Sequence, residues 1–138
     1  MSRCHSVGWV LSVAIALLSV SGCAKEIPEP GGQAIDFSSP KNVVSHIFWA
    51  ARTGTDSGLA SLCDSNFGNP SVKRICAVRK SSPDWESFRE NFARGTLNGE
   101  PRIAGDRAVL KFHYGPDGAT PQTMTLERRD KKWFLKSF

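Results

Sequence analysis

The motifs that the sequence lacks already limit its function. It contains only three histidines, none at a spacing suited to a metal, and no Cys-x-x-Cys pair, which excludes the common zinc and redox motifs. It also has no recognisable nucleophile motif and no phosphate-binding loop. The sequence therefore predicts no catalytic residue, no metal site and no cofactor.

A dense cluster of basic residues is also missing. The chain has 18 basic and 13 acidic residues, a net charge of +5, and nucleic-acid-binding proteins concentrate lysine and arginine more strongly. Nucleic acid is therefore not an expected partner. The main basic cluster, Arg128-Arg129 and Lys131-Lys132 around Asp130, is interpreted as a solvated hairpin turn, and attraction to anionic lipid headgroups or a cell-wall polymer is the alternative.

Long apolar runs are scarce, and the single one lies between Val7 and Val20. Its length of about 14 residues is too short for a bilayer, which needs about 20. Arg3 precedes it and Val-Ser-Gly-Cys at 20–23 ends it, an arrangement that is similar to the export signal and lipobox of bacterial lipoproteins. Only a thiol accepts the diacylglycerol, so Cys23 is the predicted lipidation site. An ordinary secretory signal and an uncleaved N-terminal anchor are the alternatives.

This N-terminal signal predicts three parts: a lipoprotein signal peptide over residues 1–22, a flexible linker over 23–38 and one globular domain over 39–138. The linker is rich in proline and glycine and has no apolar periodicity. The acyl chains on Cys23 would tether the domain to a membrane. Ala24 is not the aspartate that retains lipoproteins at the inner membrane of enteric bacteria, so we expect the outer membrane, facing the periplasm.

Two further cysteines remain once Cys4 is removed and Cys23 is lipidated. Exported proteins meet an oxidising compartment, and Cys63 and Cys76 lie 13 residues apart. A disulfide that closes such a ring is worth about 3 kcal/mol in the chain-entropy model. This spacing favours a disulfide, with two separate buried thiols or half of a metal site as the alternatives.

The first half of the domain has helical periodicity. Ser39 is a candidate N-cap for a helix over 40–52, whose apolar residues recur at the spacing of one buried face. A short apolar stripe follows at 59–63, then a loop over 64–70 and a short helix over 70–79 that brings Cys76 back towards Cys63. A third helix is predicted from Trp85 to Gly95, with Ser82 as its cap signal.

From Thr96 onward the apolar residues alternate, which is typical of strands. Strands are predicted over 102–104, 107–114, 123–128 and 132–138, with turns at 105–106 and 115–118. The residues expected to face the helices are Ala108, Leu110, Phe112, Tyr114, Met124, Leu126, Trp133 and Leu135. Helices followed by an antiparallel meander predict an α+β domain.

Four motifs in this order are familiar: a Ser-Pro followed by Val-Val-x-x-Ile-Phe-x-Ala-Ala, then Gly-Asp-Arg-Ala-Val-Leu-Lys-Phe, a Gly-x-Asp-Gly turn and a closing Lys-Lys-Trp-Phe-Leu. Over residues 38–138 the chain resembles small lipoproteins of the NTF2-like (cystatin-like) superfamily, in particular the DUF4878 group. The resemblance implies N-terminal helices packed on a curved antiparallel sheet to form a cone, often with a pocket. The longer segment 64–82 is expected to fill or cover the mouth of that pocket.

The resemblance also implies candidate pocket residues, which are His46, Tyr114 and Trp133. Superfamily enzymes such as ketosteroid isomerase and scytalone dehydratase project acidic, histidine or tyrosine groups into the pocket, but neighbouring strand residues such as His113 and Tyr114 point to opposite faces. The rest of the expected interior is apolar. We therefore expect a membrane-tethered binding or adaptor module for an envelope protein or a small apolar ligand. An isomerase or dehydratase with an acid–base group in its pocket is the alternative.

Overall fold

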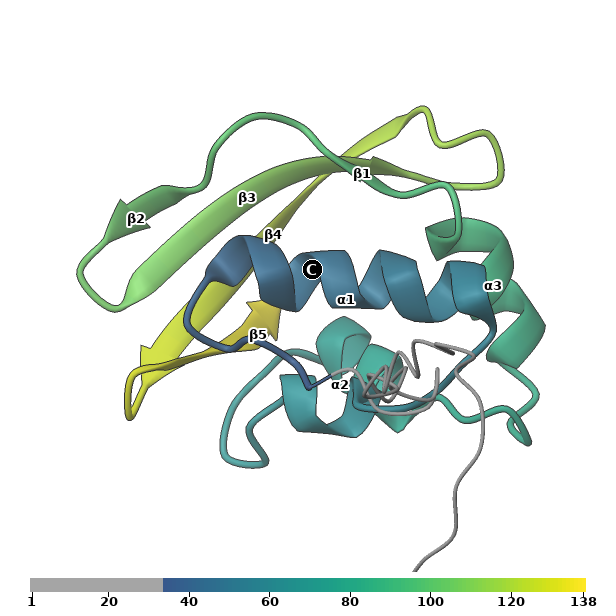
Figure 1. Cartoon of the computed structure of the whole chain (residues 1–138), viewed down its shortest axis with the longest axis horizontal. Helices are drawn as coiled ribbons and strands as arrows, with labels where there is room; N and C mark the ends of the chain where they lie inside the picture. Colours follow the sequence, from purple (N-terminus) through teal and green to yellow (C-terminus); the bar gives the residue numbers. More distant parts are fainter. Residues whose placement is uncertain (1–33) are drawn as a thin grey trace, which may run out of the picture.

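The structure is a computed structural model that describes residues 34–138. The predicted signal peptide, Cys23 and most of the predicted linker lie outside the described residues. Within residues 34–138, three α-helices, one 3-10 helix and a five-stranded antiparallel sheet form an α+β fold (Figure 1). No helix in this part of the chain has both the length and the apolar character needed to cross a membrane.

The first helix, α1 (Pro40–Thr53), follows the predicted apolar stripe. Proline at its first position costs no hydrogen bond there, and Gly54 ends the helix in the left-handed conformation at φ +71°. Val44, Ile47 and Phe48 are fully or nearly buried. Because these residues share one face, they hold α1 against the concave side of the sheet.

The predicted serine caps are wrong in their details. Ser39 occupies the N-cap position of α1, but its side chain makes no capping hydrogen bond. The nearby Asp36 carboxylate instead accepts a hydrogen bond from the Asn42 side chain at 2.8 Å. Ser82 lies before α3 (Trp85–Phe92), and its hydroxyl donates to the carbonyl of Arg79 at 2.7 Å, closing a turn and not capping the helix.

The segment between α1 and α3 contains the 3-10 helix η1 (Leu59–Leu62) and α2 (Pro70–Ala77). Asn69 caps α2, because its side chain accepts the backbone N–H of Val72 at 3.0 Å. The predicted disulfide is present: it joins Cys63 to Cys76 with their Cα atoms 6.1 Å apart. The covalent bond therefore fixes α2 beside η1.

The sheet begins with two short strands, β1 (Thr96–Leu97) and β2 (Arg102–Ala104), which both pair with β3 (Arg107–Tyr114). The next strands are β4 (Thr120–Arg129) and β5 (Lys132–Ser137), giving the order β1-β3-β4-β5. Strand β1 was not predicted, and β4 begins three residues before its predicted start at Thr123. The register places Leu110 opposite Met124 and Leu126 opposite Leu135, so the apolar residues share one face.

The sheet curves over α1, and α3 lies near the C-terminal end of that helix (Figure 1). The Arg89 side chain on α3 donates to the carbonyl of Ala51 at 3.2 Å, which ties the two helices together. The residues predicted to face inward are at most 2% exposed, except Tyr114, which is half-buried: Ala108, Leu110, Phe112, Met124, Leu126, Trp133 and Leu135. Packed side chains therefore occupy the space between α1 and the sheet.

Candidate ligand cavity between α2 and α3

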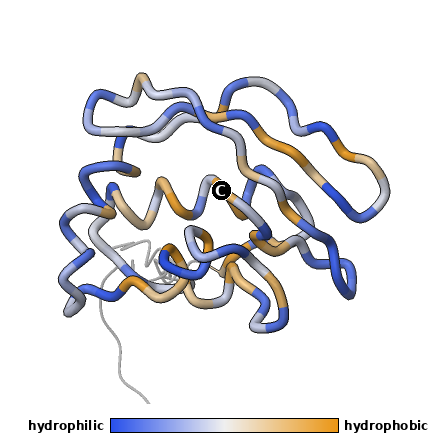
Figure 2. The backbone as a smooth tube through the Cα atoms, turned by 180° about the vertical axis from the view of Figure 1, so that it is seen from behind, coloured by the Kyte–Doolittle hydropathy of each residue, from blue (hydrophilic) through white to orange (hydrophobic). Residues whose placement is uncertain are grey.

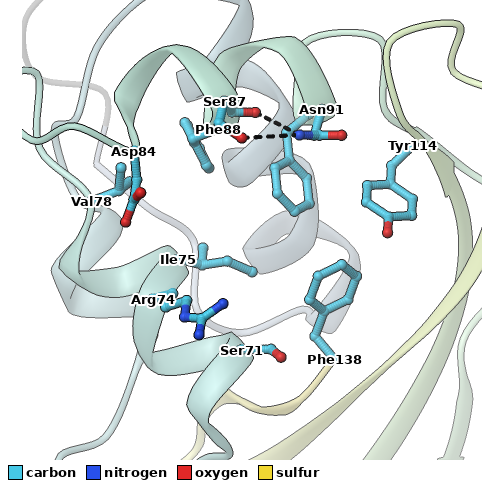
Figure 3. Close-up of a pocket in the computed structure, with 11 residues that line it drawn as sticks. Ser71, Arg74, Ile75, Val78, Asp84, Ser87, Phe88, Asn91, Tyr114 and Phe138 are labelled. Atoms are coloured by element: carbon cyan, nitrogen blue, oxygen red, sulfur yellow. Dashed lines mark hydrogen bonds between the residues drawn. The ribbon is translucent and has the colours of Figure 1, made fainter.

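A cavity of about 550 Å³ lies between α2, α3, the end of β3 and the last residue of the chain (Figure 3). Both helices contribute residues at the spacing of one helix face. On α2 these are Ser71, Arg74 and Ile75, with Val78 directly after the helix. On α3 they are Ser87, Phe88 and Asn91, with Asp84 directly before the helix. Side chains at this spacing point the same way, so each helix presents one mixed polar and apolar stripe to the cavity.

The floor of the cavity is aromatic. The ring centroid of Phe92 lies 5.6 Å from that of Tyr114 and 5.7 Å from that of Phe138. The Tyr114 and Phe138 rings meet edge to face, with their centroids 5.4 Å apart. These separations suit favourable aromatic pairs. The cluster continues into the core, where Phe138 stacks on Phe112 at 5.7 Å. The floor is therefore supported by the packed interior and is preformed.

The rim of the cavity is polar. The Asn91 side chain donates to the Ser87 carbonyl at 2.7 Å, as the dashed lines of Figure 3 show. Within the described residues, Arg74, Asp84 and Tyr114 share no hydrogen bond or ion pair with one another. That part of the chain also contains no group of three or more potential metal-ligating side chains. The rim offers isolated polar groups and no assembled acid–base pair.

The structure does not bring the three predicted pocket residues together. Tyr114 lines the cavity, whereas Trp133 lies in the core with the Arg128 guanidinium 5.3 Å from its ring centroid. His46 is buried on α1, and its Nε2 donates to the Ser57 carbonyl at 2.8 Å. His46 also packs against Trp49, with the ring centroids 5.0 Å apart. Its contacts indicate a structural role for this histidine.

The segment 64–82, expected to fill or cover the mouth of a pocket between the helices and the sheet, supplies one wall of the cavity between α2 and α3. Helix α2 lies within this segment and carries Arg74 and Ile75 to the cavity. The Cys63–Cys76 disulfide holds that wall in place. The sequence does show the stripes on α2 and α3, but nothing local indicates that they face each other across a cavity.

Comparisons with known proteins find no family model, no curated protein and no solved structure that matches this chain. No relative's activity therefore suggests a ligand. The class of ligand that fits the cavity is instead defined by its size, its aromatic floor and its polar rim.

Proposed function

We propose that the protein is a membrane-tethered periplasmic lipoprotein whose domain binds a small apolar ligand in the cavity between α2 and α3. The observation that carries the proposal is the aromatic floor beneath a polar rim. The cavity volume of about 550 Å³ is within the range of small-molecule sites. Each Å² of apolar ligand surface buried there would contribute about 25 cal/mol.

The proposed ligand has an aromatic or acyl body and one polar end. The body would lie against Phe88, Phe92 and Tyr114, while the polar end would remain near Arg74 and Asn91 at the rim. An unpaired polar group held deep in the cavity would lose its hydrogen bonds to water, which disfavours uniformly polar ligands. An adaptor role, in which an envelope protein inserts an apolar side chain, would use the same surface.

The family and the location belong to this proposal. Helices followed by an antiparallel meander, with α1 beneath a curved sheet, support membership of the NTF2-like superfamily and its cone architecture. Tethering through Cys23 at the outer membrane is supported by the Val-Ser-Gly-Cys motif at 20–23 and by Ala24. The Cys63–Cys76 disulfide supports an oxidising compartment such as the periplasm.

Binding of the apolar fluorescent probe N-phenyl-1-naphthylamine tests the cavity. We expect the full chain to enhance the fluorescence of the probe, and Ser87→Trp at the rim to weaken binding at least about tenfold by occupying the space of the ligand body. Ser61→Trp, an exposed position on η1 outside the cavity, is the matched control and should bind normally. Equal effects of the two substitutions, or no binding by the unmodified chain, would remove the cavity as a ligand site.

Mass spectrometry under native conditions, on protein purified from its own envelope, tests for the natural ligand. A co-purifying small molecule that Ser87→Trp displaces supports the ligand-binding role. Crosslinking in the envelope tests the adaptor role: a partner that is captured by the unmodified protein and lost in Ser87→Trp, without any small molecule, would favour the adaptor.

A further inference from the structure

The outer surface of the sheet, on the side away from α1, is strongly basic. Residues alternate between the two faces of a strand, and the inward set that includes Leu110, Leu126 and Leu135 is buried. The outward charged residues of β2 to β5 are six basic residues and one acidic residue. We call this set the outer basic face, and it consists of Arg102, Arg107, Lys111, Arg129, Lys132, Lys136 and the acidic Glu127.

This face holds the whole charge imbalance of the described residues. Residues 34–138 contain sixteen basic and eleven acidic side chains. Ten basic and ten acidic side chains remain when the outer basic face is set aside, so the rest of the domain is electrically balanced. The excess of five positive charges is therefore concentrated on one side of one sheet.

Four of the six cations of the outer basic face form no ion pair within residues 34–138. Glu127 accepts hydrogen bonds from Lys136 and, at 3.1 Å, from Arg129, and Asp64 approaches Arg129 at 4.0 Å. By contrast, among the described residues no ion pair or side-chain hydrogen bond involves Arg102, Arg107 or Lys111 on β2 and β3, or Lys132 on β5. Arg107 lies directly opposite Glu127 in the register of β3 and β4, but the carboxylate of Glu127 bonds Arg129 and Lys136.

The acidic residue Asp106, close to the outer basic face, does not pair with its cations. Asp106, in the turn between β2 and β3, pairs with Arg128 at 3.1 Å. The turn between β4 and β5 beside Lys132 is hydrophilic throughout, as Figure 2 shows. The turns that border the outer basic face are therefore polar, and Arg102, Arg107 and Lys111 on the face are exposed.

We propose that the outer basic face docks onto the anionic headgroups of a phospholipid bilayer. Most side chains among its cations are small or polar, such as Ala104, Thr123 and Thr125, and the aliphatic Val109 on β3 is half-buried. Its one aromatic residue, Phe134, is half-buried against the rings of Phe37 and Phe67.

The centre of a stable protein interface usually has an exposed aromatic or aliphatic anchor, and this face has none. Its attraction is electrostatic and spread over several strands, which suits phosphate groups repeated across a plane. Each basic residue near an anionic lipid surface raises affinity about fivefold, since it contributes about 1 kcal/mol. This proposal is independent of the ligand cavity and of Cys23, because the face would act with or without either.

Binding of the full chain to vesicles of phosphatidylcholine, with and without phosphatidylglycerol, tests the proposal. Any lipid anchor or apolar N-terminal run contributes to binding of both kinds of vesicle. The difference in affinity between the two kinds therefore reports the contribution of the outer basic face. We expect tighter binding to the phosphatidylglycerol vesicles and loss of that difference at high salt. The triple substitution Arg102→Gln, Arg107→Gln and Lys111→Gln should reduce the preference on the order of a hundredfold.

The matched control removes the same charge elsewhere, through Lys73→Gln, Lys80→Gln and Arg94→Gln, which are exposed positions outside the outer basic face. It should keep most of the preference. A charge-conserving triple, Arg102→Lys, Arg107→Lys and Lys111→Arg, should keep it as well, which separates charge from folding.

Three outcomes would overturn the proposal. The first is equal binding of the unmodified chain to the two vesicle compositions, and the second is an equal loss in the control and in the outer basic face variant. The third is binding of soluble polyphosphate or of an acidic protein without any preference for phosphatidylglycerol, which would assign the face to a soluble anionic partner.

Discussion

The ring of Phe48 lies directly against the backbone of Gly95. A Cβ atom built on Gly95 would occupy the space of the ring, and the φ of Gly95 is not positive. Glycine is needed here for close approach and not for a left-handed angle. The contact sets how closely α1 approaches the junction between α3 and β1. It therefore helps to position α3, which borders the cavity.

Gly95→Ala should destabilise the fold by about 1–3 kcal/mol, because the added methyl group forces Phe48 out of its packed position. Urea unfolding measures this. Gly99→Asn is the control, since nothing lies within 4 Å of a Cβ atom at that position and asparagine tolerates its positive φ. Combining Gly95→Ala with Phe48→Leu should cost less than the two single changes added together. Strict additivity would contradict the proposed clash.

Cys63→Ala should lower the melting temperature by several degrees, and only in oxidising buffer. The disulfide closes a ring of 13 residues and is worth about 3 kcal/mol in the chain-entropy model. Thermal unfolding with and without reductant measures the effect. If the unmodified protein melts at the same temperature in both buffers, the disulfide does not stabilise the fold.

His46→Phe should destabilise the protein by about 1–3 kcal/mol, because the Ser57 carbonyl loses its hydrogen bond from a buried ring. His113→Phe changes a half-buried residue on β3 whose side chain makes no hydrogen bond among residues 34–138, and should stay within about 0.5 kcal/mol of the unmodified protein. Denaturant unfolding compares the two. Binding of the cavity probe should be unchanged in the folded His46→Phe protein, and a specific loss of binding would give His46 a functional role.

Asp36 should make stability depend on pH in the acid range. Hydrogen bonds from Ser38, and then from Asn42, lower the pKa of the Asp36 carboxyl below its usual 3.8. The ionised group therefore contributes stability above that pH, and the contribution is lost as the pH falls through the lowered pKa of the folded state.

The advantage in melting temperature of the unmodified protein over Asp36→Asn should be constant near neutral pH and should shrink below about pH 3.8. Thermal unfolding across the acid range measures it. Glu90→Gln, at an exposed position on α3, provides the comparison. A difference in melting temperature that grows as the pH falls would contradict the predicted role of the ionised Asp36.

Cys23→Ser should abolish lipidation and release the domain from the membrane fraction, because a hydroxyl at that position is not diacylated. Membrane fractionation and mass spectrometry of the mature N-terminus measure this. The domain should retain its melting temperature, since the helices and the sheet of residues 34–138 all lie between Pro40 and Ser137. Unchanged fractionation with an unmodified N-terminus would refute the lipid tether.

Elements with strong periodicity could be predicted closely. Strand β3 has its predicted bounds, and α1 ends one residue beyond its predicted end at Arg52. Strand β1 could not be predicted, because two residues show no alternation and their pairing with Phe112 and His113 defines the strand. The serine caps were misjudged because no side chain among residues 34–138 caps α1 or α3, and the Ser82 hydroxyl bonds the carbonyl of Arg79 in the preceding turn. Serine can bond nearby backbone groups in more than one way, and the path of the chain decides which bond forms.

The sequence by itself determined the α+β class and the buried face of each long element, because these follow from local periodicity. It favoured the Cys63–Cys76 disulfide, which the structure contains. Only the tertiary structure decided where a cavity forms. It separates His46 and Trp133 from Tyr114 and brings Arg74 on α2 to the same space as Asn91 on α3. The physical reason is that a helix face specifies which residues point together, whereas packing against the rest of the chain specifies what they point at.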